Sequence, residues 1–160
     1  MTQRELTPPI RLLMGPGPSA IHPRVLEALA KPTVGHLDPY YLQVMDALQE
    51  MLRSIFRTAN PLTFAVSGTG SAGMETAVAN LVEPDDAMLV CVNGVFGTRM
   101  AEVARRCGAS VTEINRPWGE VFSPEDLKEQ LANVRPKVVG IVMAETSTGA
   151  WQPLEEISQI

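Results

Sequence analysis

The chain has 160 residues, of which 45% are hydrophobic and 19% are charged, a balance typical of a globular protein with one sizeable core. Its formal net charge of -5 includes no basic cluster, which argues against nucleic acid as a partner. No apolar run approaches the ~18 residues that would span a bilayer, and the N-terminus lacks the apolar core of a secretory signal, so we expect a cytoplasmic protein that binds no membrane.

Residues 1–60 are predicted to form an N-terminal arm that contains two helices. After a Pro/Gly-rich opening, a short helix is expected after His22 and a longer one after Asp38. Asp38 is a typical N-cap, and Pro39 fits the first helical position because the N–H that it lacks would have no partner there. The apolar face of the longer helix is made by Leu42, Met45, Leu48, Leu52, Ile55 and Phe56, which predicts a length of about 18 residues.

Strand-like apolar runs alternate with amphipathic helices in residues 61–160. The runs are LTFAV, AMLVCV, ASVTEI and VVGIVMA, at residues 62–66, 87–92, 109–114 and 138–144. Helices are expected from Ser71, from about Phe96 and, with Ser123 as its cap, from Pro124. Strands that are apolar on both faces belong in a parallel sheet covered by helices. The sequence therefore predicts an α/β fold, a three-layer αβα arrangement with a mostly parallel sheet.

The end of the chain is expected to be incomplete. The segment PLEEISQI, residues 153–160, has the pattern of the first turns of a fourth helix, without a stop signal. We therefore expect residues 61–160 to be the first part of a truncated domain.

Ligands of a parallel sheet collect beyond the carboxyl ends of its strands, where three loops are expected. They are SGTGSAG, NGVFG and ETSTGAWQP, at residues 67–73, 93–97 and 145–153. The first loop matches the Gly-x-Gly-x-x-Gly pattern of dinucleotide-binding proteins. That site also needs an acid at the end of the next strand, where this chain has Asn93, whereas Asp85 and Asp86 precede the strand. A dinucleotide is therefore not expected.

The first loop suits a single phosphate group instead. It offers backbone amides at a helix N-terminus, at Gly70, Ser71 and Ala72, and hydroxyls at Thr69 and Ser71. The alternative is a plain glycine turn in which Ser71 caps its helix. Phe96, in the second loop, could lie flat over a planar heterocycle or belong to the core.

Cysteine and histidine content indicates no metal site. Cys91 and Cys107 are expected to be buried packing residues of a reducing compartment. His22 and His36 are the two histidines of the chain, and no cluster with metal-ligand spacing is formed.

Four collinear segments resemble one protein family. LLMGPGPS, NPLTFAVSGTGSAGMETAVANLVEPDD, VNGVFGTRM and ETSTGAWQPLEE begin at Leu12, Asn60, Val92 and Glu145. In this order and spacing they resemble the N-terminal part of class V, fold-type I pyridoxal-phosphate aminotransferases of the alanine/serine–glyoxylate type. The resemblance runs from about Leu12 to Ile160, and it implies that residues 61–160 are the first part of the large cofactor-binding domain of that fold.

The resemblance also implies a cofactor, pyridoxal 5'-phosphate, and the residues that bind it. Thr69, Gly70 and Ser71 match the loop that binds the cofactor phosphate, Phe96 matches the aromatic residue that stacks on the pyridine ring, and Thr146 matches a position beside that ring. Gly15 and Gly17 match glycines that line the substrate pocket. Some relatives have tryptophan where this chain has Phe96 and histidine where it has Ser71, so the contacts with ring and phosphate are expected to differ.

The reaction implied is transamination of alanine or serine with glyoxylate or pyruvate, by a homodimer in which the N-terminal arm packs on a second subunit. No catalytic residue is assigned in this chain. The Schiff-base lysine of the family, the aspartate that pairs with the pyridine nitrogen and the arginine that binds the substrate carboxylate lie beyond the position of Ile160. Lys31, Lys128 and Lys137 do not match that lysine, so the chain is expected to be a fragment without activity alone.

Two other functions stay open at this point. One is another fold-type I enzyme, a lyase or a cysteine desulfurase, although the desulfurase would need a mobile nucleophilic cysteine. The other is a non-catalytic domain that binds a phosphate ligand, which would apply if the chain really ends at residue 160.

Overall fold

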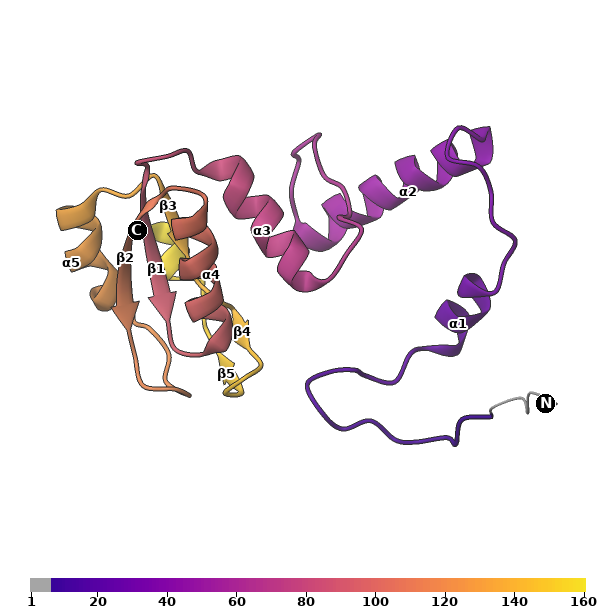
Figure 1. The fold of residues 1–160 in the computed structure, drawn as a ribbon, viewed down its shortest axis with the longest axis horizontal. Coiled ribbons are helices and arrows are strands. Elements are labelled where there is room, and N and C mark those ends of the chain that lie inside the picture. Colours follow the sequence, from indigo (N-terminus) through magenta and orange to yellow (C-terminus); the bar gives the residue numbers. More distant parts are fainter. Residues whose placement is uncertain (1–6) are drawn as a thin grey trace. The chain divides into compact units, whose positions relative to one another are not determined.

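A computed structural model describes residues 7–160. The described chain forms two compact units, the arm unit of residues 7–64 and the sheet unit of residues 65–160 (Figure 1). No helix within residues 7–160 combines the length and the hydropathy needed to cross a membrane.

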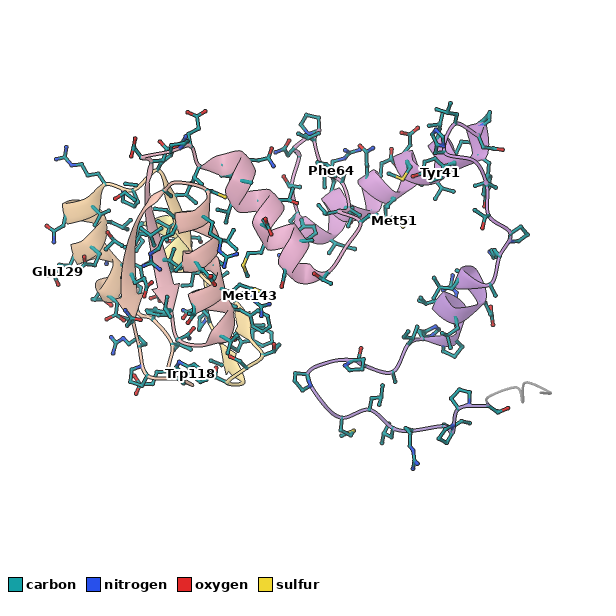
Figure 2. The ribbon with its side chains drawn as sticks, in the orientation of Figure 1. Tyr41, Met51, Phe64, Trp118, Glu129 and Met143 are labelled. Carbon is teal, nitrogen blue, oxygen red and sulfur yellow. The ribbon has the colours of Figure 1, made fainter. Side chains whose placement is uncertain are left out.

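The arm unit contains the two predicted helices, α1 (Pro23–Leu29) and α2 (Pro39–Phe56). Asp38 caps α2, since its Oδ1 accepts a hydrogen bond of 2.8 Å from the backbone N–H of Tyr40. The helix has the expected 18 residues and ends where Arg57 takes a left-handed conformation with φ 50°. Figure 2 shows Tyr41 and Met51 along this helix.

The prediction of a strand at residues 62–66 is wrong, because this segment has no strand conformation. Its polar backbone groups are engaged locally instead. The side chain of Asn60 accepts from the N–H of Leu62 at 3.1 Å, and the hydroxyl of Thr63 donates to the carbonyl of Asn60 at 2.8 Å. The apolar run is not buried either, since Leu62 and Phe64 are exposed. An apolar run becomes a strand only where another strand pairs with it, and within residues 7–160 no strand pairs with this one.

The sheet unit is built on three parallel strands, β1 (Ala87–Val92), β2 (Ser110–Asn115) and β3 (Val138–Gly140). Their order is β2-β1-β3. The central strand β1 is buried from Met88 to Val92, as expected for a strand covered on both faces.

Helices cover both faces of this sheet. On one face, β1 packs with α3 (Gly70–Leu81) and α4 (Val95–Arg106) through a core that includes Val78, Val90 and Ala101. On the other face, Cys91 packs with Leu127 of α5 (Pro124–Val134). This is the predicted three-layer αβα arrangement with a parallel sheet (Figure 1).

Local signals set the ends of these helices. Ser123 and Asp126 form a reciprocal capping box at the start of α5, with Pro124 at its first position. Gly108, with φ 89°, follows the end of α4. The alternative in which Ser71 caps α3 is wrong, because Thr69 is the cap and its hydroxyl accepts from the N–H of Ala72 at 3.4 Å.

The run at residues 138–144 was predicted as one strand, which holds only as far as Gly140. The chain then leaves the sheet and forms a hairpin of β4 (Ala144–Glu145) and β5 (Ala150–Trp151). The turn is closed by bonds from the N–H groups of Thr148 and Gly149 to the carbonyl of Glu145, at 3.1 and 2.9 Å. ETSTGAWQP is therefore a hairpin and not a loop.

The last residues do not form the predicted α-helix. Residues 157–159 form a short 3-10 helix, η1 (Ile157–Gln159). Its bonds span three residues, as from the N–H of Gln159 to the carbonyl of Glu156 at 3.2 Å.

Candidate cofactor site

A pocket of about 420 Å³ lies in the sheet unit where three segments meet. Thr69, Gly70, Ser71 and Met74 come from the start of α3, Phe96 comes from the first turn of α4, and the segment around β4 completes it. The lining residues of that segment are Val142, Ala144 and Thr146. The five residues that the sequence indicated for a cofactor, Thr69, Gly70, Ser71, Phe96 and Thr146, are therefore brought together in one pocket.

The start of α3 presents free donors to this pocket. The backbone N–H groups of Gly70 and Ser71 donate no hydrogen bond to any atom of residues 7–160. They carry the partial positive charge of a helix N-terminus, which favours an anion. Gly68 allows the tight entry into the helix, since a Cβ there would lie 2.9 Å from the Cβ of Ala72. The arrangement provides two amides and the adjacent hydroxyl of Ser71 to a phosphate-sized group.

Arg99 adds a full positive charge beside these donors. Its Nη1 donates a hydrogen bond of 2.7 Å to the hydroxyl oxygen of Ser71, and its guanidinium carbon lies 5.3 Å from the centroid of the Phe96 ring. Arg99 is not among the site residues predicted from the sequence. The signal that could have found it is the spacing of Phe96 and Arg99, because residues three apart share one face of a helix.

Glu145 ties the hairpin to the first turn of α4. Its side chain is buried, with 1% exposed, and its Oε2 accepts from the N–H groups of Phe96 and Gly97 at 2.9 and 3.2 Å. Its Oε1 accepts from the N–H and the hydroxyl of Ser147 at 3.2 and 2.5 Å. The hydroxyl oxygen of Ser147 in turn accepts from the N–H of Val95 at 3.0 Å. The first three amides of α4 are thus satisfied from a distant segment.

The glycines of NGVFG permit this close approach. A Cβ on Gly94 would lie 2.4 Å from Cγ of Glu145, and a Cβ on Gly97 would lie 2.8 Å from the carbonyl oxygen of Cys91. Both distances are below van der Waals contact, so any side chain at either position would displace α4 from the sheet or from the hairpin.

Other predicted residues lie elsewhere. Gly15 and Gly17 are exposed residues of the arm unit, and their role in a substrate pocket stays a prediction. Lys128 and Lys137 do not line the pocket and are paired. Nζ of Lys137 lies 2.5 Å from Oδ2 of Asp86, and this contact raises the pKa of Lys137 and lowers that of Asp86.

The geometry around β1 agrees with the argument against a dinucleotide. Asn93 follows β1 and is buried, and its Nδ2 donates to the carbonyl of Glu120 at 2.7 Å. Asp86 precedes β1, at the end of the strand opposite to Asn93. Within residues 7–160, no group of three or more histidine, cysteine, aspartate or glutamate side chains is arranged to hold a metal ion.

The two cysteines differ in burial. Burial, assisted by the charge of Asp126, raises the pKa of the Cys91 thiol to about 12, which leaves it unreactive. The sequence predicts that Cys107 is buried, but this C-cap residue of α4 is only half-buried.

The three-layer fold of the sheet unit is that of fold-type I pyridoxal-phosphate aminotransferases. The chain belongs to the class V aminotransferase family, because the sequence model described as Aminotransferase class-V matches residues 12–160. Enzymes of this family use pyridoxal phosphate.

Individual relatives are similar over nearly the whole chain. The (S)-ureidoglycine–glyoxylate transaminase of Bacillus subtilis and the alanine–glyoxylate aminotransferase of Mus musculus are each 41% identical over 157 residues. The crystal structure of alanine–glyoxylate aminotransferase from Nostoc sp. superposes with a TM-score of 0.94 at 52% identity, over 99% of this chain and 42% of that one. The matches to these two transaminases include 98% of this chain, but the chain spans only 38% of the length of either relative.

Proposed function

We propose that the pocket binds pyridoxal 5'-phosphate and that the protein catalyses transamination of alanine or serine, with glyoxylate or pyruvate as the keto acceptor. One observation carries the proposal: a helix N-terminus with free amides, an aromatic ring and a threonine line one pocket of a size suited to a small cofactor. The names of the similar proteins, which include alanine–glyoxylate aminotransferases, support the choice of substrates.

The phosphate end of the cofactor would be held by the start of α3. The amides of Gly70 and Ser71 would donate to phosphate oxygens along the helix dipole, and the hydroxyls of Thr69 and Ser71 can donate further bonds. Arg99, already bonded to Ser71, would balance part of the phosphate charge.

The ring end would lie against Phe96. The face of this side chain would stack on the pyridine ring, with the side chain of Thr146 beside it. When bound, the cofactor supplies an electron sink for the α-carbon of the amino acid. The residues of this pocket orient that ring and exclude water from one of its faces.

We assign no catalytic residue within the chain. None of the eight residues that line the pocket is a lysine. We propose that the Schiff-base lysine, the aspartate for the pyridine nitrogen and the arginine for the substrate carboxylate lie beyond the position of Ile160, as the family resemblance implies.

We also propose that the protein acts as a homodimer in which α2 contributes to the subunit interface. The support is the apolar surface that α2 exposes within the described chain. Met51, Ile55 and Phe56 are 56, 72 and 71% exposed, and an isolated surface of this kind is usually covered by a partner. Sedimentation equilibrium on the protein expressed from its complete gene tests this, and a monomer at micromolar concentration would refute it.

The function is tested on the same protein by spectroscopy. Titration with pyridoxal phosphate should give a visible absorbance band that survives desalting and shifts when L-alanine or L-serine is added. Turnover is then measured for each amino acid with glyoxylate and with pyruvate as acceptor. L-cysteine serves as the contrasting substrate: its conversion to alanine, with release of sulfide when dithiothreitol is present as the reductant and without transfer of an amino group from alanine or serine, would replace the proposal by a desulfurase.

A further inference from the structure

A single buried carboxylate lies at the centre of the contacts between the hairpin and α4. Most helices satisfy their first amides with the side chain of their own N-cap, but the N-cap of α4 is Gly94, which has none. Glu145 replaces it from another part of the chain, by accepting from the N–H groups of Phe96 and Gly97. The charge of the carboxylate also complements the positive end of the α4 dipole.

This carboxylate is bonded to one pocket residue and adjacent in the chain to another. The backbone amide of Phe96 is one of its donors, and the ring of Phe96 lines the pocket. Thr146, the next residue after Glu145, lines the same pocket. The position of the Phe96 ring relative to Thr146 therefore depends on the bonds of one side chain.

We propose that Glu145 is a positioning residue of the cofactor site, which fixes the Phe96 ring and Thr146 at the separation that the cofactor ring requires. Glu145 does not line the pocket, so it acts through these two residues and not by touching the cofactor. The inference rests on the proposed function, because it assumes that the pocket binds pyridoxal phosphate.

The packing around Glu145 leaves it little freedom. Its side chain is 1% exposed, and a Cβ on Gly94 would overlap it. Buried hydrogen bonds to a carboxylate are strong, and removing the acceptor leaves the donors unsatisfied, since water cannot replace it without a rearrangement. The first turn of α4 is therefore expected to loosen when the carboxylate is removed.

A purely structural role would give a different result, and Gln152 provides the matched control. Gln152 is also 1% exposed and lies just after β5. Its side chain accepts from the N–H of Phe122 at 2.8 Å and donates to the carbonyls of Phe122 and Pro153 at 3.0 and 2.8 Å. It thus joins the same hairpin to the segment before α5, and it does not line the pocket. Losing it should lower stability without moving Phe96.

The experiment compares Glu145→Ala, Glu145→Gln and Gln152→Ala with the wild type, in the protein expressed from its complete gene. The first readout is amide hydrogen exchange of Phe96 and Gly97 in the cofactor-free protein. The second is the dissociation constant for pyridoxal phosphate, and the third is the thermal unfolding temperature without cofactor. Glu145→Ala should speed hydrogen exchange at both amides. It should also lower the affinity for the cofactor by about tenfold, the size of effect expected when a hydrogen bond to a charged group is lost.

Glu145→Gln keeps one oxygen acceptor and loses the charge, so it should lower the affinity for the cofactor by only about threefold. Gln152→Ala should lower the unfolding temperature as much as Glu145→Ala does while leaving cofactor affinity and exchange at Phe96 unchanged. If Glu145→Ala does not fold, Glu145→Gln is compared with Gln152→Ala instead. The inference then requires that Glu145→Gln, and not Gln152→Ala, lowers cofactor affinity and speeds exchange at Phe96.

Two results would overturn the inference. One is a loss of cofactor affinity in Gln152→Ala equal to that in the Glu145 variants, which would make the effect one of general stability. The other is unchanged exchange at Phe96, or unchanged affinity, after loss of the carboxylate. Failure of the proposed function is distinguishable, because the wild type would then not bind pyridoxal phosphate at all.

Discussion

The guanidinium group of Arg99 lies over the ring of Phe96, 5.3 Å from its centroid, while it donates a hydrogen bond to Ser71. One side chain thus contacts both the residue proposed for the phosphate and the residue proposed for the pyridine ring. The two ends of the candidate site are coupled through it, and the following predictions separate their contributions.

Ser71→Ala should weaken binding of pyridoxal phosphate by about tenfold. The substitution removes a hydroxyl donor and keeps the helix amides, and a hydrogen bond to a charged group contributes about 1.5 kcal/mol. Equilibrium dialysis measures the change. Ser158→Ala, which removes the hydroxyl of a serine that donates to the carbonyl of Glu155, is the control. Equal affinity in the Ser71 and Ser158 variants would argue against a phosphate at the start of α3.

Phe96→Ala should weaken cofactor binding, because aromatic stacking contributes about 0.5–1.5 kcal/mol beyond burial. Phe96→Trp should be tolerated, since tryptophan keeps an aromatic ring and has the larger face. Phe122→Ala, at a buried phenylalanine on the α5 side of the sheet, is the control for loss of apolar packing. Phe96 would be only a core residue if both alanine variants lowered stability and neither affected cofactor affinity selectively.

Arg99→Gln should lower the affinity for the cofactor, and the loss should be largest at low salt. Arg99 is exposed, so its attraction to a phosphate is screened as ionic strength rises. Arg99→Lys should restore part of the affinity, because lysine keeps the charge but not the planar contact with Phe96. Arg105→Gln, on the same helix, removes an exposed arginine that pairs with Glu113 and serves as the control. Affinity that depends on salt equally in wild type and Arg99→Gln would exclude this role.

The capping box of α5 should make stability fall in acid. The backbone N–H of Ser123, together with Arg116, holds the pKa of Asp126 below its ordinary value. A carboxyl with a lowered folded pKa stabilises the fold above its unfolded pKa of about 4, and this contribution is lost as the pH falls through the folded pKa. The difference in free energy of unfolding between wild type and Asp126→Asn should therefore be larger at pH 7 than at pH 3. Urea titrations at both values test this, and an equal difference would contradict it.

Cys91 should resist thiol reagents in the native protein. Its raised pKa of about 12 means that the folded protein keeps this thiol protonated at pH 8, whereas the unfolded chain would ionise it near its ordinary value. Labelling followed by mass spectrometry should show Cys107 modified first and Cys91 modified only after denaturant is added. Rapid labelling of native Cys91 would show that the core around β1 opens readily.

The sequence alone determined the elements whose signals are local. Asp38 with Pro39, and Ser123 with Pro124 and Asp126, begin α2 and α5 where predicted, because a helix cap involves residues only two or three apart. The alternation of apolar runs and helices likewise predicted the parallel sheet. The motifs that carry the family resemblance also indicated five site residues, and these five line one pocket in the structure.

The tertiary structure decided what depends on residues far apart. Residues 62–66 form no strand because no strand in the described part of the chain pairs with them, and the run after β3 leaves the sheet to form a hairpin. Glu145 caps a helix that begins about fifty residues earlier in the chain, and no local pattern connects the two. A buried carboxylate is placed by the packing of the whole unit, so the contact between β4 and α4 depends on the tertiary structure.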